Sequence, residues 1–199
     1  MRLFVAVEIG TAIANEAGRV VEELRRRAAS LAPRAKATWI PPDRMHLTIR
    51  FIGKVDKDMR RGVETALHPP IPVAPFTLAI AGVGAFPASG HPRVIWAGVS
   101  TGRQSLDEIE RVVTARLERV GIPAENRAFR PHLTLARIRE TGGLRSRALV
   151  ERERDVWLGR TQVDAITLFE SRLSPKGPTY VPLQRTALGA LENPPSHTP

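Results

Sequence analysis

Residues 46–49 read His-Leu-Thr-Ile, and residues 132–135 read His-Leu-Thr-Leu. Both copies lie in stretches rich in β-branched and aliphatic residues, which are typical of strands. The copies are 86 residues apart, since 132 − 46 = 86. The same shift carries the apolar stretch 76–86 onto 162–172, which is also strand-like. An internal repeat of strand, helix, motif strand, helix and strand follows from this register.

The pattern outside the motifs predicts an α+β fold. We expect strands at 2–8, 46–55, 76–86, 93–100, 128–138, 162–173 and 179–186, and helices at 11–31, 56–67, 103–120 and 144–158. The repeat then predicts two pseudo-symmetric lobes, with antiparallel sheets lining a central cleft and helices outside. We expect residues 1–186 to form one bilobal domain, and the proline-containing tail 187–199 to be disordered.

Strand alternation assigns the motif side chains to faces. His46 and Thr48 share one face while Leu47, Ile49 and Phe51 take the other, and His132 and Thr134 share a face in the second copy. By the same parity, Arg50 and Arg130 fall on the histidine faces, where they could clamp a phosphate. The alternative is that both arginines are rim residues of a protein that is basic throughout and do not bind the phosphate.

Two imidazoles and two hydroxyls suit phosphodiester hydrolysis. One histidine can take a proton from water while the other protonates the leaving oxygen, because the ordinary histidine pKa of about 6.5 allows both states near neutral pH. The threonine hydroxyls can stabilise the charge that builds on the phosphate. A structural role for the histidines and a metal site are the alternatives. Against a metal, the chain has no cysteine and no His-Glu-x-x-His spacing, and two histidines fall short of the usual three ligands.

The composition indicates an anionic partner. The formal net charge is +10, from 30 basic and 20 acidic residues. Nucleic acid is one explanation, and replacement of lysine by arginine through compositional drift is another. We expect a soluble, cytoplasmic protein without a membrane segment, because no apolar run reaches the length of a signal peptide core or a membrane span.

The chain resembles the 2H phosphoesterase superfamily, which is named for its paired His-x-Thr/Ser-x motifs. Within it the chain is similar to the RNA 2′,3′-cyclic phosphodiesterases, formerly described as 2′-5′ RNA ligases. The likeness spans about residues 2–186 and includes residues 2–6, 46–53, 129–137 and 171–180.

This resemblance implies hydrolysis of RNA 2′,3′-cyclic phosphate ends, or of a small cyclic nucleotide, to 2′-phosphomonoesters. It implies His46 as the proton donor and His132 as the proton acceptor, no cofactor and no metal, with reversible 2′-5′ joining as related chemistry. We expect a monomer. The competing hypothesis is an RNA-binding module that keeps the fold without turnover.

Overall fold

The computed structural model describes residues 1–174 and 177–189. The strands are β1 (Arg2–Val7), β2 (Lys36–Trp39), β3 (Leu47–Lys54), β4 (Phe76–Phe86), β5 (Val94–Thr101), β6 (His132–Glu140), β7 (Trp157–Val163), β8 (Ala165–Ser174) and β9 (Gly177–Ala187). The α-helices are α1 (Gly10–Leu31), α2 (Lys57–Leu67), α3 (Arg103–Glu118) and α4 (Ser146–Val150), and the short 3-10 helices are η1 (Pro42–Arg44) and η2 (Glu151–Glu153). The protein is therefore α+β, as the sequence predicts.

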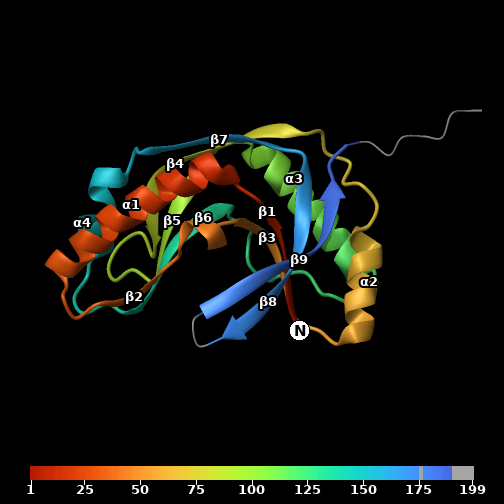
Figure 1. Cartoon of the computed structure of the whole chain (residues 1–199), viewed down its shortest axis with the longest axis horizontal. Helices are drawn as coiled ribbons and strands as arrows, with labels where there is room; N and C mark the ends of the chain where they lie inside the picture. The colour runs from red at the N-terminus through yellow and green to blue at the C-terminus, as the bar shows by residue number, and fades with distance from the viewer. Residues whose placement is uncertain (175–176, 190–199) are drawn as a thin grey trace, which may run out of the picture.

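One curved antiparallel sheet runs through the molecule (Figure 1). Its strand order is β7-β4-β5-β6-β3-β1-β8-β9, and β2 pairs with residues 136–140 of β6, beyond the point where β6 pairs with β3. The two halves of the sheet meet where β3 pairs with β6, and the recorded residue pair at that seam is Leu47 with Leu133. The middle residues of the two His-Leu-Thr copies thus lie directly opposite one another.

Each half of the sheet takes strands from both halves of the chain. β4 belongs to the first repeat but pairs with β5 of the second, and β8 belongs to the second repeat but pairs with β1 of the first. The short connection between residues 86 and 94 explains the first pairing, because strands joined by a tight turn form a hairpin. α1 lies in the first half of the chain and packs on β7 of the second half, whereas α3 lies in the second half and packs on β3 of the first. The helices, like the strands, therefore pack against elements of the other half of the chain.

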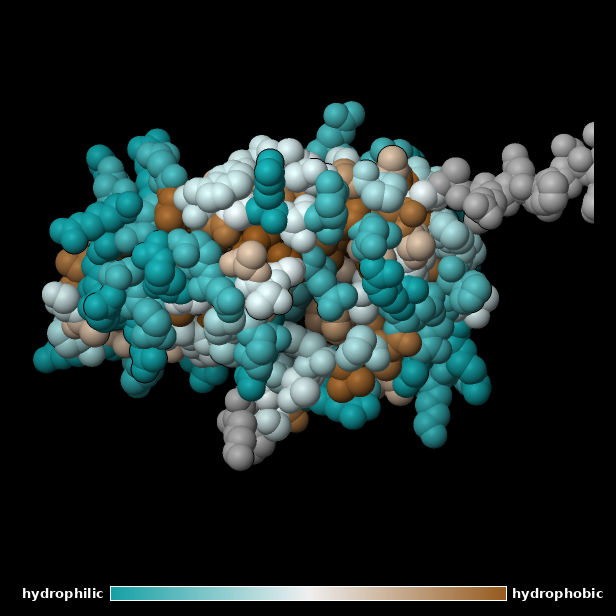
Figure 2. All heavy atoms as spheres, turned by 45° about the horizontal axis from the view of Figure 1, so that its top comes forward, coloured by the Kyte–Doolittle hydropathy of each residue, from teal (hydrophilic) through white to brown (hydrophobic). Residues whose placement is uncertain are grey.

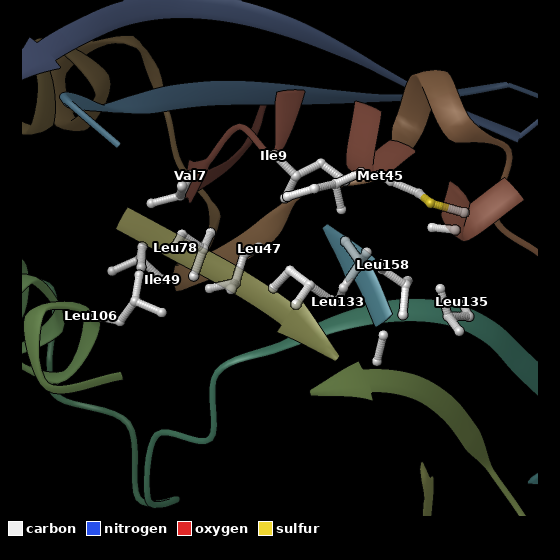
Figure 3. Packing of buried hydrophobic residues seen from close by; sticks show 14 of the residues in the cluster. Val7, Ile9, Met45, Leu47, Ile49, Leu78, Leu106, Leu133, Leu135 and Leu158 are labelled. Atoms are coloured by element: carbon white, nitrogen blue, oxygen red, sulfur yellow. The ribbon is translucent and has the colours of Figure 1, made fainter. Parts of the chain in front are cut away.

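The core lies on the helix-covered face of the sheet. Figure 3 shows Leu47 and Leu133 side by side among other aliphatic residues of this cluster. Both are fully buried. α1 approaches the sheet closely at Gly159 of β7, where an added Cβ would lie 3.3 Å from Cγ1 of Ile13. α1 and α4 lie at one end of the sheet and α2 and α3 at the other (Figure 1).

Three stretches differ from the sequence prediction. The expected helix 144–158 is only α4 and η2, and the chain then enters β7, an edge strand beside β4. β2 occupies a stretch for which the sequence pattern predicts no strand. In the expected disordered tail, Ala187 ends β9 and the buried Leu188 bridges to Ile71, so the prediction was wrong for those residues. The remainder of that tail, 190–199, lies outside the described residues.

Hydrophilic side chains cover most of the face seen in Figure 2, with apolar residues visible between them. Within the described ranges, no helix is long and apolar enough to cross a bilayer.

Candidate active site

The register at the seam pairs each histidine with the other motif's threonine. β3 and β6 run antiparallel through Leu47 and Leu133, so position 46 lies opposite 134, and position 48 opposite 132. Directly opposite residues of an antiparallel pair project from the same face, with Cβ atoms about 4.5–5.5 Å apart. The four polar side chains of the two motifs therefore gather on the face that points away from the main core.

Two adjoining cavities open on this face. The first, of about 390 Å³, is lined by His46 and Thr134 among others. The second, of about 700 Å³, is lined by His132. Thr48 and Phe51 line both cavities, so the two share a wall. Each predicted histidine and threonine thus lines at least one of these two adjoining cavities.

Both imidazoles are held in the same way. His46 Nδ1 lies 3.0 Å from the Arg44 carbonyl oxygen, and His132 Nδ1 lies 2.7 Å from the Arg130 carbonyl oxygen. A carbonyl oxygen can only accept a hydrogen bond, so each Nδ1 carries a proton and donates it. Nε2 is then the nitrogen of each ring that is able to take up or release a proton in the site.

The surroundings of the two rings differ. His46 packs 4.8 Å from the Phe4 ring and meets Tyr180 edge-on at 4.9 Å, beside a small apolar cluster of Phe4, Ala6 and Phe169. Burial lowers the pKa of His46, the hydrogen bond to the Arg44 carbonyl acts in the opposite direction, and the positive charge of Arg137 lowers it further. His132 has one recorded ring neighbour, Phe86, at 5.6 Å.

Cationic residues surround both cavities. They are Arg2, Arg44, Lys54 and Arg137 at the first cavity and Arg93, Arg127 and Arg130 at the second. Among the described residues that line the cavities, Glu125 is the one acidic side chain. The site is therefore suited to an anionic ligand.

Arg50 is not on the histidine face, so the parity prediction was wrong for this residue. A bulge at Ile49 interrupts the pairing of β3 with β1, where Val5 pairs with Arg50 and Ala6 with Thr48. The extra residue reverses the alternation beyond Thr48. Arg50 is only 2% exposed, and Phe51 is 56% exposed and faces the cavities. Phe51 had been expected on the core side.

A matching bulge in β6 brings Arg137 into the site. Ile95 pairs with Ala136 and Trp96 with Thr134, which leaves Leu135 without a paired residue in β5. Phe51 and Arg137 are equivalent by the 86-residue shift, and both line the first cavity. Strict alternation predicts neither residue in the site, and no signal along a single strand marks the bulges that bring them there.

Arg130 precedes β6, so it lies outside the strand on which the parity prediction rested, and it lines the second cavity beside His132. Its side chain is exposed, and its carbonyl oxygen orients the His132 ring. Across residues 1–174 and 177–189, no group of three or more histidine, cysteine, aspartate or glutamate side chains is arranged to hold a metal ion.

The chain matches the family model described as "LigT like Phosphoesterase" over residues 12–96 and 98–180. The matched segments start 98 − 12 = 86 residues apart, the same distance as that between the histidines. An RNA 2′,3′-cyclic phosphodiesterase of Aeropyrum pernix is 36% identical over 146 residues, covering 71% of this chain and 80% of that protein. One of Archaeoglobus fulgidus is 31% identical over 184 residues, covering 92% and 98%.

Among solved structures, TT0787 of Thermus thermophilus superposes with a TM-score of 0.68 at 28% identity, covering 94% of this chain and 98% of that one. The family model matches most of the chain, and the chain covers 80% and 98% of the two relatives. The fold is shared with a solved structure. The chain therefore belongs to the LigT-like phosphoesterase family.

Proposed function

We propose that this protein hydrolyses 2′,3′-cyclic phosphate ends of RNA to 2′-phosphomonoesters, with His46 and His132 as its acid–base pair. The observation that supports the proposal most directly is that equivalent hydrogen bonds hold the rings of His46 and His132. Each imidazole donates from Nδ1 to the carbonyl two residues before it and keeps Nε2 for the substrate. The names of the relatives, RNA 2′,3′-cyclic phosphodiesterases, support the choice of substrate.

The reaction needs two proton transfers at one phosphorus. His132 Nε2 takes a proton from water, and the water oxygen forms a bond to phosphorus. The bond between phosphorus and O3′ breaks, and His46 Nε2–H delivers its proton to O3′. The 2′-phosphomonoester leaves, and exchange with solvent returns both rings to their starting states. The assignment of donor and acceptor rests on the family resemblance.

The donor role requires His46 to be protonated, although burial lowers its pKa in the free protein. An anionic phosphate close to the ring favours the imidazolium and opposes this effect. Substrate binding and protonation of His46 are therefore coupled in the proposal, and His46 becomes an effective acid in the complex.

Thr48, Thr134 and the cations complete the proposed site. The two hydroxyls lie across the seam from the opposite motif's histidine and can donate hydrogen bonds to the non-bridging phosphate oxygens. Arg137 at the first cavity and Arg130 at the second supply positive charge for the phosphate and the adjoining RNA backbone. With an RNA 5′-hydroxyl in place of water, the same attack on the cyclic phosphate would form a 2′-5′ phosphodiester while the bond between phosphorus and O3′ breaks and His46 protonates O3′.

We also propose that residues 1–186 act as one bilobal unit built from two copies of the repeat. The exchange of β4 and β8 between the halves of the sheet supports this, because neither copy would hold a complete half-sheet by itself.

The test is incubation of the purified chain with a short RNA ending in a 2′,3′-cyclic phosphate. We expect conversion to a product with a 2′-phosphate, identified by its resistance to a 3′-specific phosphatase and by ³¹P NMR. Binding without product would instead favour the RNA-binding module, and a 3′-phosphate product would show that O2′ is the leaving atom.

A further inference from the structure

Arg50 is a buried cation with partners on one short segment. Its Nη2 donates to the Pro123 carbonyl oxygen, and its Nη1 lies 3.2 Å from Glu125 Oε1. The same carboxylate oxygen accepts a hydrogen bond from the Phe51 backbone N–H at 3.3 Å. Nε and Nη1 of Arg50 have no hydrogen-bond partner among the described residues, so Nη1 and Glu125 form an ion pair without a hydrogen bond. Glu125 is 44% exposed, whereas Arg50 is buried and would be left without a nearby counter-charge if Glu125 were removed.

The segment that Arg50 holds forms part of the site. Residues 123–131, the last part of the connection from α3 to β6, form no helix or strand, and within the described ranges no backbone–backbone hydrogen bond ties this stretch to another element. The stretch supplies Arg127, Phe129 and Arg130 to the second cavity. It also supplies the Arg130 carbonyl oxygen that orients His132.

The position of Arg50 links this segment to the first motif. Arg50 lies two residues after Thr48 and directly before Phe51, both of which line the second cavity from the β3 side. The two motif strands are joined by one recorded residue pair, Leu47 with Leu133. Few backbone bonds therefore fix the distance between the motifs on the cavity side of the seam.

We propose that Arg50 and Glu125 are a pair of positioning residues that hold the wall of the second cavity and the His132 ring in register with Thr48. This inference rests on the proposed function. Neither residue needs to contact the phosphate, because the pair acts through the Arg130 carbonyl and the cavity wall. Displacement of a catalytic group by about 1 Å can lower a rate about 100-fold.

The test compares Arg50→Met and Glu125→Gln with wild type in kcat and KM for the cyclic-phosphate RNA. We expect a roughly 10–100-fold loss of kcat in folded protein for each variant. Because the two residues act as one unit, the double variant should lose little more than the worse single variant. If Arg50→Met fails to fold, Glu125→Gln decides the matter, since it keeps the side-chain size and an oxygen for the Phe51 N–H.

Arg27→Met is the matched control. Arg27 also donates to a backbone carbonyl, that of Leu149 at 2.7 Å, and pairs with a glutamate, Glu153. This pair joins α1 to η2 and lines neither of the two cavities. The control is expected to lose stability but to keep kcat within about twofold. Equal kcat losses in Arg27→Met and Arg50→Met, or wild-type kcat in folded Arg50→Met and Glu125→Gln, would overturn the inference.

Backbone ordering separates this inference from the proposed function. The ¹⁵N order parameters of residues 124–130 should be lower in Arg50→Met and Glu125→Gln than in wild type or Arg27→Met. An inactive wild-type protein would refute the proposed function, and this readout would still test whether the Arg50–Glu125 pair holds the segment. Unchanged order parameters in that segment would refute the positioning role whatever the wild-type activity.

Discussion

Replacing the two imidazoles by alanine, singly and together, gives a quantitative test of the paired mechanism. Each ring carries one proton transfer, which is worth about 10²–10⁴-fold in rate. Since a tenfold change corresponds to about 1.36 kcal/mol, each single variant should lose about 2.7–5.4 kcal/mol of transition-state stabilisation. If His46 and His132 acted independently, the double variant would lose about 10⁴–10⁸-fold. Because one transfer is of use only when the other completes the reaction, we expect the double variant to lose little more than the worse single variant.

The assay is the initial rate at saturating cyclic-phosphate RNA, corrected for the folded fraction. That correction matters most for His46→Ala, since the ring packs against Phe4 and Tyr180 and its removal leaves a gap. His91→Ala is the control, because His91 Nδ1 also lies within hydrogen-bond distance of a backbone carbonyl oxygen, that of Leu144 at 3.0 Å, and His91 lines neither cavity. Full activity in either single variant, or losses that multiply in the double variant, would refute the paired mechanism.

Further predictions concern charge, burial and metal. The positive charge of Arg137 lowers the pKa of His46, so Arg137→Gln should raise the midpoint of its NMR titration; an unchanged or lower midpoint would count against this effect. Burial lowers the His46 pKa below the unfolded value of about 6.5, so the unfolded chain binds more protons. The free energy of unfolding, measured in urea, should therefore fall as the pH drops from about 7 to about 5, and it should fall by less in His46→Gln than in wild type. An equal fall in both proteins would contradict this link between His46 protonation and stability. Leu133→Ala, at the fully buried seam, should lower the free energy of unfolding by about 2–5 kcal/mol in urea, and a loss under about 1 kcal/mol would mean that the seam repacks. Hydrolysis should persist in EDTA; a loss restored by a divalent cation would favour a metal mechanism.

Period-two alternation was sufficient to predict the centre of the site. It placed Leu47 and Leu133 in the core and their flanking histidines and threonines together on the other face, because these residues precede the bulges in both strands. The alternation failed immediately afterwards, at Arg50 and Phe51. A bulge depends on how a strand pairs with its neighbour, and residue types along one strand do not encode that pairing.

Long-range pairing also explains the remaining differences. The short strands β2 and β7 are stabilised by their partners β6 and β4 rather than by their own sequences, since β7 follows a charged stretch that favours a helix. The exchange of β4 into the other half of the sheet follows from its short connection to β5. The 86-residue repeat gives equivalent positions along the chain but does not state which half-sheet each strand joins.

The most direct measurement is a crystal structure with a nucleoside 2′,3′-cyclic vanadate, which imitates five-coordinate phosphorus. The paired mechanism predicts that Nε2 of His46 lies about 2.6–3.2 Å from one apical oxygen and Nε2 of His132 lies the same distance from the opposite one. A vanadate reached by one imidazole alone, or bound away from both motifs, would contradict it.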